Sequence, residues 1–312
     1  MDYRELLLLW AARESGVLEA VTFHAGTPDG VAEEAGVTER AARITLEAMA
    51  EQGYLKEVGG SYETTNKALG FVAKTDVRSI GSIPHQLDCL DRWFDLPETM
   101  QTGELPEKSD DPDESATSDD WTANFVGAMY DVDEATVRAS VTEAVHRNPD
   151  AERVLDAGGG PGRFAKEFVR RGFDVTLLDR PEVIDIDRRF LEHEPIELVE
   201  GDVTDSLPTG FDIVFCSRLA HGLGPGENKQ LLANAADALE PGGAVVLTDK
   251  VRGHADDAAL FGAHMLAQTE RGDTYTESQF ADWFDAAGLE AFEVKDVPGT
   301  NLQALTGIAP RD

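Results

Sequence analysis

The sequence predicts an α/β protein in which a helical N-terminal region precedes a doubly wound sheet of five parallel strands and a C-terminal antiparallel pair. Three observations predict this fold. From residue 152 onward, short apolar runs alternate with helix-like segments. The first run leads into a glycine-rich loop, where parallel sheets place their ligand sites. The last two runs are joined only by "PGT", which is too short for a parallel crossover.

The predicted strands and helices can be followed in order along the second half of the chain. The five parallel strands are "RVLDA", "DVTLLD", "IELVEGD", "FDIVFCS" and "AVVLTD". Helix-like segments at about 162–171, 181–192 and 226–239 fill the first, second and fourth gaps. A long segment and the helix "TESQFADWFDAAG" then lead to the closing strands "LEAFEVKDV" and "NLQALTGIA".

Residues 1–75 have the element order of a winged helix, with helices followed by a hairpin. The segment "TPDGVAEEAGV" has Thr27 as its N-cap, and "TERAARITLEAMAEQGYL" begins a further helix near Thr38. We expect one face of that helix to carry Ile44, Ala48 and Met49. "YLKEVGGSYETT" alternates about two glycines, which is typical of a β-hairpin.

The middle of the chain, residues 76–148, is predicted to be a mainly helical connector. It contains "ELPEKSDDPDESATSDD" (104–120), whose eight acids and one lysine predict an exposed loop. Residues 149–312 then form the ligand-binding domain. The predicted organisation therefore has three parts.

The charge of the chain is strongly negative. Sixty acidic residues face 27 basic ones, for a net charge of −33, and the acids are spread along the whole chain. This pattern favours adaptation to a salty cytoplasm, hence a halophilic source, over a basic partner. No signal peptide or membrane span is visible, so we expect a cytoplasmic protein without membrane contact. Cys89 and Cys216 lie far apart in the sequence and predict neither a disulfide framework nor a metal site.

The loop in "VLDAGGGPGRFAKEF" leaves several ligands open. Gly160, Gly162 and Ala165 fit a dinucleotide-binding pattern, and Asp179 follows at the spacing of a ribose-binding acid. Two acids disfavour that interpretation, because Asp156 directly precedes the glycines, near a bound pyrophosphate, and Asp202 ends the third strand. No P-loop lysine follows the glycines, which also disfavours ATP.

S-adenosylmethionine fits these acids better, because it has no phosphate and carries a sulfonium and an ammonium group. Asp156 then lies near the methionine moiety, Asp179 takes the ribose hydroxyls, and Asp202 accepts from the adenine amino group. The alternative is that each acid simply ends a strand in an acid-rich protein.

Several segments together resemble one family. "VLDAGGGPGRFAKEF", "LLDRPEVI", "EGDVTDSLP", "SRLAHGLGPGENKQLLANAADALEPGGAVVLTD" and "ADWFDAAGLEAFEV" are similar, in order, to motifs of the small-molecule O-methyltransferases, class I enzymes with an N-terminal winged-helix dimerisation domain. Plant caffeate and flavonoid enzymes and bacterial hydroxyneurosporene and polyketide enzymes belong to that family. The resemblance covers nearly the whole chain.

The resemblance implies a fold, a cofactor and a reaction. It implies a Rossmann-like seven-stranded methyltransferase sheet, a homodimer formed through the N-terminal domain, and methyl transfer to a small-molecule hydroxyl. No metal-ligand cluster stands out in the sequence, so we expect a metal-independent enzyme. Positioning of the two reactants is then the main source of catalysis. The residues expected to hold S-adenosylmethionine are Asp156, Gly158, Gly160, Asp179, Arg180, Asp202, Val203, Ser217 and Arg218.

The candidate catalytic base is His221. In the family a histidine begins an H-D-W segment after the fourth strand, and His221 occupies that position. Histidine titrates near neutrality, which suits a base. Here Gly222 and Leu223 replace the acid and the tryptophan, so the orienting groups differ.

The acceptor pocket is expected to use apolar residues from two segments. The candidates are Trp121, Phe125, Met129, His264 and Met265. The "FVGAM" segment resembles the family's F-x-x-A-M, whose residues border the substrate; the alternative for each residue is core packing. Trp93 is interpreted as packing.

Two other functions remain open. A winged helix suggests a DNA-binding regulator, but residues 1–75 carry 12 acids and 7 bases, whereas phosphate contacts need Lys and Arg. We therefore expect no nucleic-acid partner. The altered "HGL" segment also allows a non-catalytic S-adenosylmethionine binder, and methylation of nitrogen or of a protein is not ruled out.

Overall fold

The structure is a computed structural model that describes residues 2–68, 81–106 and 118–311. The chain forms two compact units. The first comprises Met1–Asp91 with Ala123–Asp131, and the second comprises Arg92–Thr122 with Val132–Asp312. The connector predicted at 76–148 is thus shared between the units, and the three-part division stays a prediction.

The first unit contains the predicted helices and hairpin. Its elements are α1 (Tyr3–Glu14), α2 (Val17–Glu19), a π-helical turn η1 (Ala20–His24), α3 (Pro28–Glu34), α4 (Glu39–Glu51), β1 (Leu55–Val58) and β2 (Ser61–Thr64). Thr27 and Thr38 cap α3 and α4, accepting from the N–H groups of Gly30 and Ala41 at 3.4 and 3.2 Å. β1 and β2 pair antiparallel, as the alternating pattern predicts. The winged-helix assignment stays a prediction.

The predicted buried face of α4 is wrong in one position. The side chains that α4 buries are Ala42, Leu46 and Met49, whereas Ile44 is 41% exposed. Spacings of four and three residues keep the buried set on one stripe, and Ile44 lies two residues, more than half a turn, from Leu46. Met49 is buried as predicted.

Three long helices follow in the middle of the chain. They are α7 (Ile83–Thr102), which crosses from the first unit into the second, α8 (Ser118–Tyr130) and α9 (Glu134–Arg147). Most of the acidic loop predicted at 104–120 lies outside the described residues, and its last three residues begin α8.

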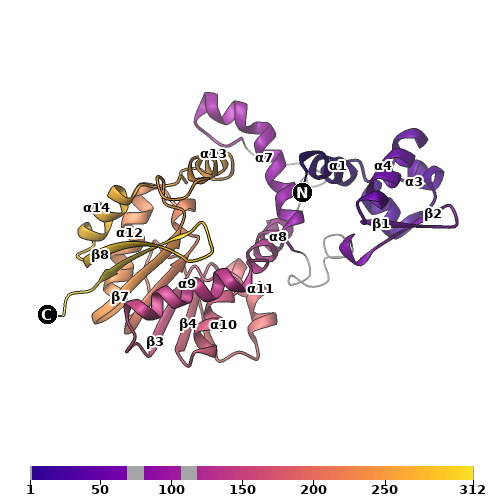
Figure 1. The fold of residues 1–312 in the computed structure, drawn as a ribbon. Helices are drawn as coiled ribbons and strands as arrows, with labels where there is room; N and C mark the ends of the chain where they lie inside the picture. Colours follow the sequence, from indigo (N-terminus) through magenta and orange to yellow (C-terminus); the bar gives the residue numbers. More distant parts are fainter. Residues whose placement is uncertain (1, 69–80, 107–117, 312) are drawn as a thin grey trace. The chain divides into compact units, whose positions relative to one another are not determined.

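The second unit is built on a seven-stranded sheet, and this confirms the predicted fold class (Figure 1). Its strands are β3 (Arg153–Ala157), β4 (Asp174–Asp179), β5 (Ile196–Glu200), β6 (Phe211–Ser217), β7 (Leu239–Asp249), β8 (Glu290–Asp296) and β9 (Gln303–Ile308). They lie in the order β5-β4-β3-β6-β7-β9-β8. In this sheet β9 runs opposite to the other strands and pairs antiparallel with β7 and β8.

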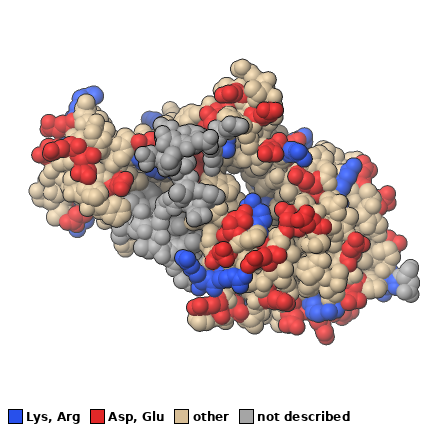
Figure 2. All heavy atoms as spheres, turned by 180° about the vertical axis from the view of Figure 1, so that it is seen from behind, with Lys and Arg blue, Asp and Glu red and all other residues tan. Residues whose placement is uncertain are grey.

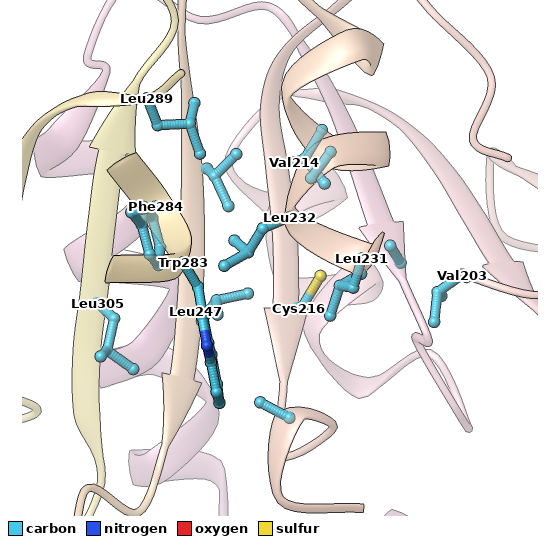
Figure 3. Close-up of a cluster of buried hydrophobic side chains, with 14 of the residues drawn as sticks. Val203, Val214, Cys216, Leu231, Leu232, Leu247, Trp283, Phe284, Leu289 and Leu305 are labelled. Carbon is cyan, nitrogen blue, oxygen red and sulfur yellow. The ribbon is translucent and has the colours of Figure 1, made fainter. Parts of the chain in front are cut away.

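Helices cover both faces of this sheet. α9, α10 (Arg163–Arg170) and α11 (Pro181–Leu191) cover one face, and α12 (Pro225–Ala238) and α14 (Glu277–Ala286) cover the other. Alternate residues of β6 accordingly enter different apolar clusters: Phe215 joins α9 and α10, and Val214 joins α12 and α14. Figure 3 shows the second cluster, where Leu232 and Phe284 lie among the sheet side chains. A 3-10 turn, η2 (Ala220–Gly222), and α13 (Ala258–Gln268) complete the unit.

The surface carries the acidic charge that the composition predicts. Figure 2 shows Asp and Glu side chains scattered over the visible face of each unit rather than gathered in one segment. No helix within the described ranges combines the length and the apolar character needed to cross a bilayer.

Candidate functional site

The candidate site lies where the strand order of the sheet reverses. β3 has β4 on one side and β6 on the other, and the chain runs outward from this point in both directions. Parallel sheets bind ligands beyond the carboxyl ends of their strands at such a switch point. The glycine loop follows β3 there, and Ser217, Arg218 and His221 end or follow β6.

The glycine loop needs its glycines for two different reasons. Gly158, Gly160 and Gly162 have φ values of 70°, 50° and 67°, a region that other residues rarely adopt. A Cβ on Gly158 would also lie 2.8 Å from Cδ2 of Leu219, whereas a Cβ on Gly160 would meet nothing within 4 Å. The lack of a side chain at Gly158 therefore lets Leu219, in the loop after β6, pack closely against the glycine loop. Gly160 has no close neighbour and leaves open space beside the glycine loop.

Asp156, directly before the loop, is a buried carboxyl group. It is 1% exposed, and neither of its oxygens has a hydrogen-bond partner among the described residues. Burial, with a smaller contribution from the charge of Asp179, raises its pKa to about 7. A cationic ligand beside Asp156 would relieve this burial cost. The carboxyl group thus fits the positively charged part of S-adenosylmethionine.

Asp187 is a second buried carboxyl group, which the sequence analysis missed. It lies in α11, is fully buried, and its oxygens also have no partner in the part of the chain that the structure describes. Burial raises its pKa to about 9, with contributions from the charges of Asp179 and Asp156. Three carboxyl groups therefore influence one another at the switch point.

Asp179 and Asp202 are held by local hydrogen bonds. Asp179 accepts from the backbone N–H groups of Gly160 and Arg180, each at 2.8 Å, although burial raises its pKa. The hydroxyl and N–H of Thr204 donate to Asp202 at 2.6 and 2.8 Å and lower its pKa. A carboxylate has about four acceptor positions, so both groups keep capacity for ligand hydroxyl or amino donors.

The remaining predicted cofactor residues differ in environment. Arg180 is half exposed and pairs with Glu182 at 3.3 Å. Val203 is buried in the cluster of Figure 3. The Ser217 hydroxyl accepts from Thr248 at 2.7 Å. Their contacts with a cofactor stay predictions, as does that of Arg218.

His221 forms a dyad with an acid that the sequence analysis did not single out. Its ring Nδ1 lies 2.7 Å from Oδ1 of Asp249, the last residue of β7. The backbone N–H of His221 reaches the other oxygen of Asp249 at 3.2 Å, and that of Lys250 reaches Oδ1 at 2.7 Å. The sequence signal was present, because Asp249 occupies the acidic position at the end of the P-G-G-x-x-x-x-x-E pattern.

The charge of Asp249 fixes the tautomer of His221. Burial alone would raise the pKa of Asp249, but the charge of His221 and the hydrogen bonds from His221 and Lys250 outweigh it, and the pKa is lowered. An ionised carboxylate only accepts hydrogen bonds, so Nδ1 of His221 carries a proton. In the neutral ring Nε2 is then unprotonated and can take a proton from a hydroxyl group.

An aromatic row leads away from His221. The His221 ring lies 4.8 Å from that of Phe261, which lies 5.7 Å from that of His264. His264 in turn stacks on Trp93 at 5.9 Å, and Nε1 of Trp93 donates to its Nδ1 at 3.1 Å. Trp93 is therefore a packing residue, as predicted, and its partner His264 is one of the residues predicted to line the pocket for the methyl acceptor. Met265, on the same helix as His264, is only 6% exposed.

The other predicted acceptor residues lie on α8. Trp121 is half-buried in the second unit, and Phe125 and Met129 belong to the first, where Phe125 packs 5.5 Å from His85. Their role in an acceptor pocket stays a prediction. Within residues 2–68, 81–106 and 118–311, no three His, Cys, Asp or Glu side chains gather as a metal site. Metal-independent catalysis also stays a prediction.

Comparisons with known proteins show which proteins this chain resembles. Residues 113–290 match the model of the O-methyltransferase domain family. The chain is 28% identical to a 3-hydroxy-5-methyl-1-naphthoate 3-O-methyltransferase of Streptomyces sahachiroi, over 94% of this chain and 89% of that one. It is 27% identical to the tetracenomycin polyketide synthesis 8-O-methyl transferase TcmO of Streptomyces glaucescens, over 94% and 91% of the two chains. Human N-acetylserotonin methyltransferase in complex with S-adenosylmethionine has the same fold, with a TM-score of 0.71 at 21% identity over 99% and 94% of the chains.

Proposed function

This chain belongs to the S-adenosylmethionine-dependent small-molecule O-methyltransferases, and we propose that its acceptor is the hydroxyl group of a small aromatic molecule deprotonated by His221. The single observation that carries the proposal is the dyad of His221 and Asp249 at the switch point, 2.7 Å apart. It supplies a base at the edge of the sheet where a ligand binds.

The residues around the glycine loop are suited to the methyl donor. When bound, S-adenosylmethionine supplies a methyl group activated by the positive charge of its sulfonium. We assign Asp156 to the cationic methionine end, because its buried oxygens have no partner within the described residues. Asp179 and Asp202 would hold the ribose hydroxyls and the adenine amino group with the acceptor capacity that their local bonds leave.

Asp249 acts as a positioning residue for His221. Its ionised oxygen holds the proton on Nδ1, which directs the lone pair of Nε2 toward the acceptor. As the acceptor proton moves to Nε2, the imidazolium that forms is stabilised by the buried Asp249 charge. The acceptor oxygen then becomes a better nucleophile without leaving its position.

The aromatic row favours a flat acceptor. Phe261 packs edge-to-face on the His221 ring, and His264 and Trp93 continue the row. Aromatic ligands stack well on such side chains. The curated relatives that span nearly the whole chain are named for a hydroxynaphthoate and for a polyketide, which supports the same acceptor class.

Two measurements test the proposed function. Calorimetry with S-adenosylhomocysteine should show binding, and the wild-type protein should transfer labelled methyl from S-adenosylmethionine to members of a naphthol and hydroxynaphthoate panel. Binding without any transfer would favour a non-catalytic binder. Salt-sensitive retention of DNA in place of either result would favour the regulator.

We further propose, on the family resemblance, that the first unit pairs two copies of the chain in a cytoplasmic homodimer. Analytical ultracentrifugation of the full chain in concentrated potassium chloride tests this proposal. A monomer at micromolar concentration would contradict it.

A further inference from the structure

Asn228 is a polar residue on the buried stripe of α12. It is 1% exposed, and the stripe continues with Leu231, Leu232 and Ala235, which are all buried. Asparagine is a poor helix former, and a buried amide costs stability unless it is hydrogen-bonded. The Nδ2 group of Asn228 donates to backbone carbonyls in the segment after β6, namely those of Ala220 at 2.9 Å, Leu223 at 3.1 Å and Gly224 at 3.2 Å. Its oxygen has no partner within the described residues, so this position uses the donors of the amide alone.

These contacts hold a short turn that has few hydrogen bonds of its own. The turn is η2, which carries His221. Two backbone bonds close it, donated by the N–H of Gly222 at 2.9 Å and by that of Leu223 at 3.3 Å. Short 3-10 turns have poor hydrogen-bond geometry, and a glycine adds backbone freedom. Asn228 therefore supplies donors where the turn by itself is weakly fixed.

The peptide bond between Ala220 and His221 is held at both edges. Its carbonyl accepts from Asn228 at 2.9 Å, and its N–H, which belongs to His221, donates to Asp249 at 3.2 Å. A trans peptide is planar, with its carbonyl and N–H on opposite sides, so the two contacts together set the orientation of the plane. That orientation directs the side chain of His221, whose Nδ1 lies 2.7 Å from Asp249.

Two further residues pack closely against the turn. Tyr275 is 2% exposed, and its hydroxyl donates to the carbonyl of Leu223. A Cβ on Gly272 would lie 2.4 Å from the carbonyl oxygen of His221, so the segment between α13 and α14 lies directly against the turn. The turn is therefore enclosed by its neighbours as well as bonded to Asn228.

From these contacts we propose that Asn228 is a positioning residue for the base: its amide holds the turn so that the ring of His221 stays against Asp249 and presents Nε2 to the acceptor. This role rests on the proposed function. A leucine would suit the apolar stripe of α12 better, but it has no donor for the three carbonyls. Displacing a reacting group by about 1 Å can cost about 100-fold in rate, which sets the scale of the expected effect.

The first test is kinetic, with a responsive naphthol as acceptor. Asn228→Leu removes the donors at nearly constant volume, and kcat should fall about 10- to 100-fold. KM should change by less than about threefold, because Asn228 is enclosed and does not touch the acceptor. Combined with His221→Gln, the same substitution should cost less than about twofold, since its effect passes through His221. Lys229→Gln changes the exposed neighbour in α12 and is the matched control, expected to behave as wild type.

The second test needs no turnover. A ring N–H that donates to a buried carboxylate is protected from exchange with water and gives a downfield proton resonance. In the full chain saturated with S-adenosylhomocysteine, His221→Gln should remove this resonance and so assign it to Nδ1. Asn228→Leu should weaken or remove it, and Lys229→Gln should leave it in place.

Thermal unfolding of each variant checks that the fold is retained. If Asn228→Leu does not fold, Asn228→Ala takes its place, because the smaller side chain leaves room for water at the three carbonyls. The expected results for kcat, KM and the resonance are the same.

Three results would overturn this role of Asn228. The first is a folded Asn228→Leu protein with a kcat within twofold of wild type. The second is an additive loss in the double variant. The third is a downfield resonance that Asn228→Leu leaves unchanged, or a wild-type protein that has none. If wild type binds S-adenosylhomocysteine but methylates no member of the panel, the proposed function fails, and the resonance alone decides whether Asn228 positions His221.

Discussion

Replacing Asp249 with Asn is expected to separate the role of His221 as a base from its role as a packed side chain. The substitution keeps the size of a side chain that is only 3% exposed, and it removes the charge that faces Nδ1 at 2.7 Å. An amide opposite Nδ1 either offers a weaker neutral acceptor or donates its own proton. In the second case the proton of the ring moves to Nε2, and the base is lost.

The expected loss follows from these two effects. A hydrogen bond to a charged group contributes about 1.5–3 kcal/mol, which corresponds to roughly 10- to 150-fold in rate. Inversion of the tautomer adds to this loss, so we expect kcat to fall about 10²- to 10³-fold. KM for the acceptor should change by less than about threefold, because Asp249 does not touch the acceptor in this mechanism.

The assay is the rate of methyl transfer from S-adenosylmethionine to a responsive naphthol, measured from pH 6 to 9 for Asp249→Asn, His221→Gln and the double variant. Residues that act as one unit give a double variant no slower than His221→Gln alone. Asp285→Asn, on the exposed side of α14, is the matched control. A kcat for Asp249→Asn within threefold of wild type, or additive losses in the double variant, would refute the dyad.

Three further predictions concern stability and the donor site. Because burial raises the pKa of Asp187 to about 9, the folded protein keeps a proton that the unfolded chain loses near pH 4, and stability should fall as pH rises between these values. Asp187→Asn should flatten this slope and raise the unfolding free energy at pH 9, as urea denaturation would report. Gly158→Ala should weaken S-adenosylhomocysteine binding about tenfold or more, because its φ of 70° and the 2.8 Å approach to Leu219 both oppose a Cβ; unchanged affinity in calorimetry would contradict the loop geometry. The unfolding midpoint should rise as potassium chloride is increased, because salt screens a net charge of −33, and a flat or falling midpoint would count against adaptation to salt.

The centre of the sheet could be predicted from the sequence because its strands are mostly buried on both faces. β3, β4 and β6 begin and end at the predicted residues, since each is a continuous apolar run bounded by charge or glycine. The helix α4 is different, because its apolar residues are compatible with more than one buried face. Packing within the first unit selects Leu46 and leaves Ile44 exposed.

The buried carboxyl at Asp187 shows how composition can conceal a site residue. In a chain with 60 acids, one more acid in a helix suggests a solvated surface. The spacing in α11 indicates otherwise, because Asp187 follows Val183 and Ile184 by four and three residues and precedes Leu191 by four. All three apolar residues are buried, so Asp187 lies on the buried stripe of its helix.

The contact between His221 and Asp249 could not be predicted from the sequence for a different reason, because it depends on how two strands pair. His221 and Asp249 are 28 residues apart, and only the register that pairs Ser217 with Thr248 brings the ends of β6 and β7 together. The acid that follows the histidine in the family's H-D-W segment is Gly222 here, which predicted that the orienting groups differ without indicating which residue takes their place. In the structure that group comes from the neighbouring strand and contacts both the ring and the backbone of His221. The departure from H-D-W therefore leaves the proposed base with an acidic neighbour, because parallel strands in register bring Asp249 to the same edge of the sheet.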